Sequence, residues 1–151
     1  MHEIYMKEAI IEAKKALELR EVPVGAVVVL GDQIIGRGFN QRETLGDPTA
    51  HAEMIAIRAA AEFLGSWRLT NTRLYVTLEP CPMCAGAIVN ARIDSLIYGA
   101  VDPKSGAVSS LMNLVQDERL NHRVEVTAGI CRETCSQMLK DFFAGLRKRN
   151  K

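Results

Sequence analysis

A histidine and a closely spaced cysteine pair most constrain the fold of this chain, because their side chains must meet at one point if they bind one metal ion. His51 is followed, across a gap long enough for a helix and a strand, by Cys81 and Cys84. An imidazole and two thiolates are ligands that zinc prefers, and a set of three leaves the fourth tetrahedral position open. The pattern therefore predicts a catalytic zinc site with His51, Cys81 and Cys84 as its ligands.

Glu53 adds the proton carrier that such a site needs. It lies two residues after His51, and a carboxylate there can take a proton from the attacking water and pass it to a leaving group. His-x-Glu followed by Pro-Cys-x-x-Cys is the signature of zinc-dependent deaminases of nucleobases and nucleosides. We therefore predict hydrolytic deamination with Glu53 as the catalytic proton carrier. The motif alone leaves cytosine and adenine both open.

Other interpretations of the cysteines are less consistent with the pattern. A Cys-x-x-Cys pair alone can be a redox pair or half of a zinc finger. A redox pair does not need His51 and Glu53, and a four-cysteine finger needs a second Cys-x-x-Cys pair. The other cysteines, Cys131 and Cys135, are four residues apart, and we expect them to be small apolar residues on a helix.

Length and composition set the context. A chain of 151 residues suits one domain, expected over 1–151. The sequence has no apolar run of roughly 18 residues or more, so we expect no membrane span. Its first residues lack the apolar core of a signal peptide. Four cysteines, two of them assigned to a metal, fit a reducing compartment, and we therefore expect a cytoplasmic protein.

The net charge of +1 does not indicate a nucleic-acid-binding protein. Basic residues nevertheless gather at the C-terminus, at Arg147, Lys148, Arg149 and Lys151. Such a cluster can contact phosphates, or it can simply be the solvated end of a helix whose dipole it complements. Taken alone, the cluster favours the solvated helix end.

Apolar spacing predicts helices alternating with strands. We expect helices over about 2–20, through 54–64, over 81–92 and over 133–149, and strands over 24–30, 33–38, 74–78, 95–100 and 123–128. The stretch 40–47 is expected to be a polar loop. This order favours an α/β domain in which helices cover both faces of a mixed sheet. Cys81 and His51 would then lie at helix starts near the carboxyl ends of neighbouring strands, where open α/β sheets bind ligands.

Four segments closely resemble the bacterial tRNA-specific adenosine deaminases, which convert the wobble adenosine of an arginine tRNA to inosine. They are Pro-Val-Gly-Ala-Val at 23–27, Asp-Pro-Thr-Ala-His-Ala-Glu-Met at 47–54, the 75–87 stretch around the cysteines, and Asn-His-Arg-Val-Glu at 121–125. The resemblance extends to 141–143. It implies a three-layer α/β/α sandwich with a five-stranded mixed sheet, one zinc ion per subunit, a homodimer, and a tRNA anticodon stem-loop as the partner.

The resemblance also assigns substrate-binding residues. Asn40 matches the asparagine that hydrogen-bonds the flipped base; without the resemblance, a turn residue that closes its loop is the alternative. Asp102, Lys104 and His122 match loop positions near the bound RNA, although each could also be an ordinary surface-loop residue. Phe143 and Arg147, four residues apart on the last helix, match a pair that contacts RNA. On the last helix we expect Phe142 to lie in the core and Phe143 to lie at its edge, where it can stack on a base.

Two alternatives stay open beside a tRNA adenosine deaminase. One is a deaminase of a small substrate such as cytidine, deoxycytidylate or guanine, which shares the metal motif. The other is a non-catalytic, zinc-stabilised RNA-binding module. Glu53 argues against the module because a structural metal site needs no proton carrier. The 121–123 loop and the basic last helix favour tRNA over a small substrate, through the resemblance alone.

Overall fold

Helices and strands follow one another in the predicted order in the computed structural model, which describes residues 1–149. The helices are α1 (His2–Glu18), α2 (Arg42–Leu45), α3 (Ala52–Leu64), α4 (Pro82–Asn90) and α5 (Arg132–Arg149). The strands are β1 (Gly25–Leu30), β2 (Gln33–Phe39), β3 (Thr72–Leu78), β4 (Ser95–Ala100) and β5 (Glu125–Ala128). The short helix α2 lies in the stretch expected to be a loop. Lys151 of the basic cluster lies outside the described residues.

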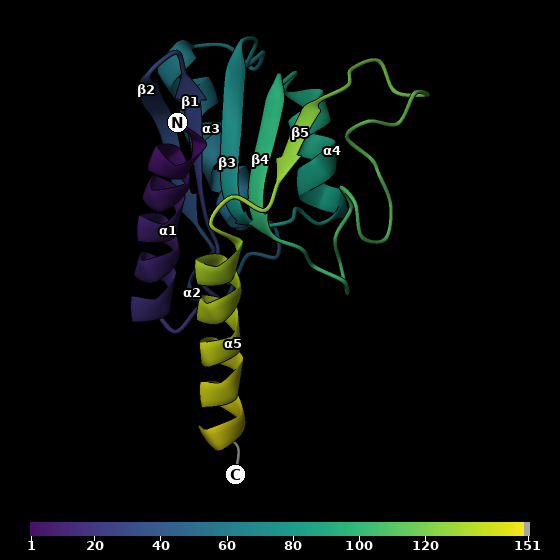
Figure 1. Ribbon diagram of the computed structural model, residues 1–151. Coiled ribbons are helices and arrows are strands. Elements are labelled where there is room, and N and C mark those ends of the chain that lie inside the picture. Colours follow the sequence, from purple (N-terminus) through teal and green to yellow (C-terminus); the bar gives the residue numbers. More distant parts are fainter. Residues whose placement is uncertain (150–151) are drawn as a thin grey trace.

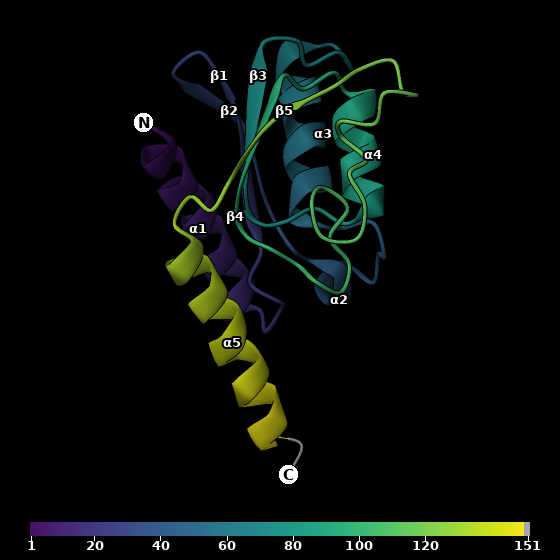
Figure 2. The same cartoon turned by 45° about the vertical axis from the view of Figure 1, so that its right-hand side comes forward.

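The strands form one five-stranded mixed sheet in the order β2-β1-β3-β4-β5. Strand β1 runs antiparallel to β2 and β3, whereas β4 runs parallel to β3 and β5. Helices α1 and α5 lie on one face of the sheet, and α3 and α4 lie on the other (Figures 1 and 2). The expected α/β/α sandwich is therefore confirmed. Within residues 1–149, every helix is too short or too polar to cross a lipid bilayer.

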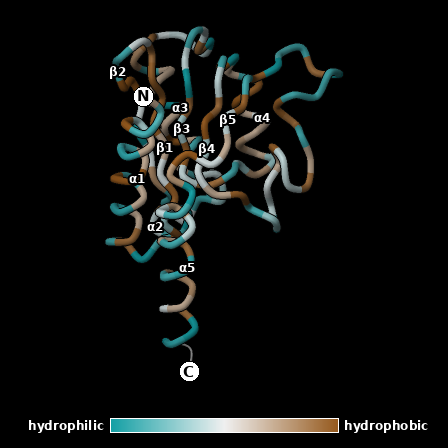
Figure 3. Tube along the Cα trace, viewed as in Figure 1, coloured by the Kyte–Doolittle hydropathy of each residue, from teal (hydrophilic) through white to brown (hydrophobic). Residues whose placement is uncertain are grey.

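Each face of the sheet buries its own apolar cluster. Val28 belongs to the cluster beneath α3 and α4, whereas Val27 and Val29 belong to the cluster beneath α1 and α5. All three side chains are fully buried. Because neighbouring strand residues point to opposite faces, a strand covered on both sides has to be apolar throughout. Helix α1 has only one covered face, and its apolar and hydrophilic colours alternate accordingly in Figure 3.

Two glycines in β2 allow α3 to lie directly on the sheet. A Cβ atom at Gly36 would come within 2.3 Å of the Ala56 carbonyl oxygen, and one at Gly38 within 2.4 Å of the Ala52 carbonyl oxygen. Ala52 and Ala56 are themselves fully buried. Small residues on both elements therefore bring the two backbones into contact. This contact fixes the position of the start of α3, and with it the position of His51.

Helix α5 differs from its prediction. Its first turns pack on the sheet through Cys135, which is 1% exposed, but its later turns extend past the sheet (Figures 1 and 2). Phe142 is only half-buried and, among residues 1–149, belongs to neither core cluster. The prediction that Phe142 is a core residue was therefore wrong. Helical spacing shows which residues share a face, but it does not show where the surface beneath that face ends.

The close contact between α3 and β2 can be tested at Gly36. Gly36→Ala places a methyl group against the backbone of α3, and we expect it to lower the free energy of unfolding by about 1–3 kcal/mol. Gly145→Ala is the matched control because a Cβ there meets nothing within 4 Å, and on an exposed helix it should not destabilise. Thermal or urea denaturation compares the two. Equal stability of both variants would contradict the proposed contact.

Candidate active site

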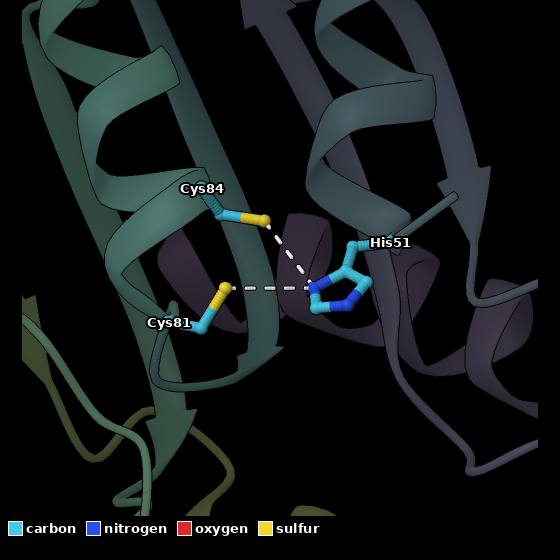
Figure 4. Close-up of side chains that lie close together, drawn as sticks. All are labelled: His51, Cys81 and Cys84. Atoms are coloured by element: carbon cyan, nitrogen blue, oxygen red, sulfur yellow. Dashed lines mark hydrogen bonds between the residues drawn. The ribbon is translucent and has the colours of Figure 1, made fainter. Parts of the chain in front are cut away.

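The three predicted ligands meet at the N-terminal ends of two helices. His51 immediately precedes α3, and Cys81 immediately precedes α4; both have extended backbone conformations, with φ −78° and ψ 153° for His51 and φ −75° and ψ 173° for Cys81. Cys84 follows in the first turn of α4. Because His51 lies outside the regular helix, its side chain is free to turn toward α4. Figure 4 shows the imidazole of His51 directed at both sulfurs.

The geometry of this group fits a tetrahedral metal ion. The His51 Nδ1 atom lies 3.6 Å from the Cys81 Sγ atom and 3.5 Å from the Cys84 Sγ atom. All three ligand atoms lie within 4.8 Å of one another. Nitrogen and sulfur ligands of one tetrahedral zinc ion, at their usual bond lengths, would be separated by about 3.6 Å. The residues present therefore fit a metal of that coordination.

The two thiols differ in acidity. A hydrogen bond from Cys84 lowers the pKa of Cys81 to about 4, and further hydrogen bonds from His51 and the Cys84 backbone act in the same direction. The pKa of Cys84 is raised, first by its hydrogen bond with Cys81 and then by burial. Both cysteines lie at the positive end of the dipole of α4, which stabilises thiolates. The thiolate of Cys81 is therefore available as a metal ligand at neutral pH.

Glu53 lies in the first turn of α3 and is 4% exposed. Burial raises the pKa of its carboxyl group to about 7, although the nearby His51 charge acts in the opposite direction. A carboxyl group whose pKa lies near neutrality can both accept and release a proton during a reaction. Glu53 lines the same pocket as His51 and Cys81, which is the position that its predicted role requires.

This pocket has a volume of about 190 Å³. Besides His51, Cys81 and Glu53, its walls include Asn40 from the segment before α2 and Asp102 from the segment after β4. Two of the residues expected to bind substrate are therefore brought to the predicted catalytic centre. Val24 and Leu78 contribute apolar wall, as a pocket for a flat, partly apolar ring requires.

Asn40 also closes its own loop. Its amide nitrogen donates to the Val22 carbonyl at 3.2 Å, and its side-chain oxygen accepts from the Arg42 backbone N–H at 3.2 Å. Both expected roles are compatible at this position, because an asparagine amide has a second N–H and a second lone pair. The backbone bonds hold the amide in a fixed orientation at the pocket wall.

Two buried glutamates that sequence reasoning missed hold the segments on either side of the pocket. Glu21, 1% exposed, accepts hydrogen bonds from the backbone N–H groups of Glu43 and Thr44 at the start of α2. Glu79, 2% exposed, accepts them from the loop formed by residues 102–110. Nothing in the sequence distinguishes these residues from surface glutamates, because their partners are backbone groups of distant segments.

The pKa of Glu79 reflects this arrangement. Its burial would raise the pKa, but hydrogen bonds from the backbones of Ser109, Asp102 and Ser110 and from the Ser110 hydroxyl outweigh it and lower the pKa to about 2. Glu79 is therefore an anion at neutral pH. Unlike Glu53, it is unsuited to carry protons.

A second hollow, between the 102–110 loop and α5, has a volume of about 490 Å³. It is lined by Lys104, Phe143 and Arg147, together with Leu139 and Leu146. Phe143 is 42% exposed. Three residues that were expected to contact RNA, although they are far apart in the sequence, therefore share one groove. The groove combines an aromatic ring with basic groups, the pairing that single-stranded nucleic acid binders use.

His122 is placed differently. Its Nε2–H donates to the Ile93 carbonyl oxygen at 2.7 Å, and the ring is half-buried. Within residues 1–149, His122 lines neither the pocket nor the groove. The structure thus does not bring His122 together with the other residues expected to contact RNA, and its visible contact anchors the long segment before β5.

Comparisons with known proteins agree with this site. The model of the MafB19-like deaminase family matches residues 1–147. The tRNA-specific adenosine deaminase of Bacillus subtilis is 56% identical over 149 residues, covering 99% of this chain and 92% of that protein. The tRNA-specific adenosine deaminase of Haemophilus influenzae is 49% identical over 147 residues, covering 97% of this chain and 85% of that protein.

Solved structures include two informative neighbours. One comes from studies of A-to-I editing by tRNA:A34 deaminases at the wobble position of transfer RNA; it is 47% identical, has a TM-score of 0.86, and covers 89% of this chain and 98% of its own. The other is the guanine deaminase of Bacillus subtilis, 43% identical with a TM-score of 0.64, covering 67% of this chain and 65% of its own.

Metal binding and proton transfer should separate in variants of this site. We expect His51→Ala and Cys84→Ala to lose the bound metal, because two ligands hold an ion far more weakly than three. Glu53→Gln should keep it, since Glu53 is assigned no bond to the ion. Elemental analysis of each purified variant measures the metal per chain. A metal-free Glu53→Gln variant would show that the assignment of roles is wrong.

Proposed function

The chain belongs to the MafB19-like deaminase family and to its tRNA-specific adenosine deaminases, and from this premise we propose that it converts adenosine to inosine in a tRNA anticodon loop. The substrate is proposed to be the wobble adenosine of an arginine tRNA. The observation that carries the proposal is that one loop, residues 102–110, lines both the pocket and the groove. Asp102 lines the pocket that contains Glu53, and Lys104, two residues later, lines the groove that contains Phe143.

The proposed cofactor is zinc, with His51, Cys81 and Cys84 as its ligands. A bound zinc ion would supply a Lewis acid that makes water acidic enough to attack the carbon bearing the amino group. Two thiolates and an imidazole are the donors that this ion prefers, and their spacing supports the assignment.

Glu53 would take the proton from the attacking water. It would then pass protons to the ring nitrogen and to the departing amine, so that water and adenosine become inosine and ammonia. Burial supports this role because it raises the pKa of Glu53 to about 7. Asn40 would hold the base by hydrogen bonds from the opposite wall of the pocket, using the donor and acceptor capacity that its loop contacts leave free.

The groove on α5 would hold the nucleotides beside the target base. A base next to the flipped one can stack on Phe143, while Lys104 and Arg147 can contact phosphates. Contacts to flanking nucleotides would then provide much of the binding energy. This argument favours a nucleotide in a loop over a free nucleoside.

We further propose a homodimer that acts in the cytoplasm. The family resemblance supports the dimer, and the cysteine thiols at the metal-ligand group support a reducing compartment. Sedimentation equilibrium of the purified protein tests the dimer directly, since one subunit has a mass of 16.7 kDa.

Deamination of a small substrate remains the second candidate, because 67% of the chain resembles a guanine deaminase at 43% identity. Incubating the protein with an anticodon stem-loop, a matched duplex, adenosine, cytidine and guanine distinguishes the candidates. We expect the stem-loop to react fastest, because unpairing a base in the duplex costs energy and free nucleosides lack flanking contacts. In Glu53→Gln, turnover should fall by about 10²–10⁴-fold. Comparable rates on guanine and the stem-loop would favour the small substrate.

Variants of residues on α5 test RNA binding separately from catalysis. Phe143→Ala should weaken stem-loop binding by about 1–3 kcal/mol through lost stacking. Arg147→Ala should reduce the salt dependence of binding by about one unit of slope through a lost phosphate contact. Lys14→Ala removes an exposed lysine on α1 that does not line the groove, and is the charge control. Titration at several salt concentrations measures all three. If Phe143→Ala and Arg147→Ala bind like Lys14→Ala, the RNA surface lies elsewhere.

A further inference from the structure

The 102–110 loop is built around the carboxylate of Glu79. The Oε2 atom accepts hydrogen bonds from three successive backbone N–H groups, those of Val108 at 3.1 Å, Ser109 at 2.8 Å and Ser110 at 2.9 Å. The Oε1 atom accepts from the Asp102 N–H at 3.0 Å and from the Ser110 hydroxyl at 2.5 Å. Both ends of the loop are thus held by one buried side chain.

Glu79 also belongs to the segment that carries a metal ligand. It follows the end of β3 directly and precedes Cys81 by two residues. Between them, the Pro80 carbonyl oxygen accepts a hydrogen bond from the Ala107 N–H at 2.9 Å. The same short piece of chain therefore supports the metal-ligand group and holds the loop whose Asp102 and Lys104 line the pocket and the groove.

Residues 102–110 belong to no strand, so hydrogen bonds from outside a sheet hold the loop. Asp102 Oδ1 accepts from the N–H groups of Lys104 and Ser105 within the loop, whereas the bonds to Glu79 and Pro80 tie the loop to the segment before Cys81. A buried carboxylate is stable only when hydrogen-bond donors surround it, and successive backbone N–H groups form such an anion-binding concavity. Gly106 lies so close that a Cβ there would come within 2.3 Å of the Glu79 carboxyl carbon. The loop is thus closed tightly over the carboxylate.

We propose that Glu79 is a positioning residue that holds the 102–110 loop in the conformation that binds RNA; the effect on RNA rests on the function proposed above. Glu79 lines the pocket wall, but its carboxylate oxygens are occupied by the loop. It acts on the substrate through Asp102 and Lys104. Loss of its charge should therefore loosen the loop and raise KM, with little effect on the chemical step.

Glu79→Gln tests this with a nearly unchanged shape. An amide has one acceptor oxygen, and its NH₂ group must face some of the N–H donors. In the least disruptive orientation the oxygen keeps the three bonds at residues 108–110, and the NH₂ group faces the Asp102 N–H. Glu12→Gln is the matched control: Glu12 is 3% exposed and pairs with Lys15 and Arg37, on α1 and β2.

A second pair of variants disturbs the loop without altering Glu79. Gly106→Ala places a methyl group against the Glu79 carboxylate. Gly86→Ala adds a methyl group in α4, where nothing lies within 4 Å of it. If Glu79→Gln does not fold, this pair still tests whether the contact with Glu79 holds the loop.

Three measurements are made on each protein: amide hydrogen exchange of residues 102–110, zinc content, and KM and kcat on the anticodon stem-loop. For Glu79→Gln and Gly106→Ala we expect faster exchange in the loop by about tenfold or more. Zinc should be retained, KM should rise about tenfold, and kcat should stay within about threefold. Glu12→Gln and Gly86→Ala should match the wild type in loop exchange and KM.

The proposal is overturned if Glu79→Gln and Gly106→Ala match their controls in loop exchange and KM, or if Glu79→Gln loses zinc, because Glu79 would then act through Cys81. If the wild type leaves the stem-loop unchanged, the proposed function is wrong. In that case, amide hydrogen exchange of residues 102–110 still shows whether Glu79 holds the loop. The experiment therefore distinguishes a wrong proposed function from a wrong role for Glu79.

Discussion

The contact of α3 with β2 is the constraint on which the site depends. Gly36 and Gly38 leave no side chain between the two backbones, so α3 lies in direct backbone contact with the sheet. Its start is thereby set opposite the start of α4, which is separated from the end of β3 by three residues. His51 and Cys81, the residues immediately before these two helices, then face each other, with the His51 Nδ1 atom 3.6 Å from the Cys81 Sγ atom. Rigid elements hold ligand geometry more accurately than loops do.

Two segments beside the pocket, the one around α2 and the 102–110 loop, are held instead by buried carboxylates. Glu21 and Glu79 each place a buried carboxylate beneath backbone N–H groups that would otherwise lack partners. Such groups are costly to bury unpaired. The solution resembles helix capping, except that the acceptor comes from a distant part of the chain. Glu53 is buried among fewer donors, and the result is the opposite shift: the pKa of Glu53 is raised, whereas that of Glu79 is lowered.

Much of this molecule could be predicted from its sequence because the decisive signals are local. The element order follows from apolar spacing, and the metal-ligand group follows from a motif whose members lie at helix starts. What escaped prediction depends on tertiary contacts. The carboxylates of Glu21 and Glu79 bind segments 22 and more residues away. Phe142 has the spacing of a core residue, but its helix extends beyond the sheet that would have covered it.

The separation of pocket and groove has a physical consequence for recognition. A pocket lined by Asn40 and Glu53 can accept a base but gains little energy from a single ring. In the proposed function, the groove beside Phe143 and Arg147 would bind the chain that carries the base. Binding energy gained there can offset the cost of unstacking the base and directing it at the catalytic group. Because one loop forms part of both hollows, its conformation would determine, in the proposed function, whether a nucleotide chain in the groove can deliver its base to Glu53.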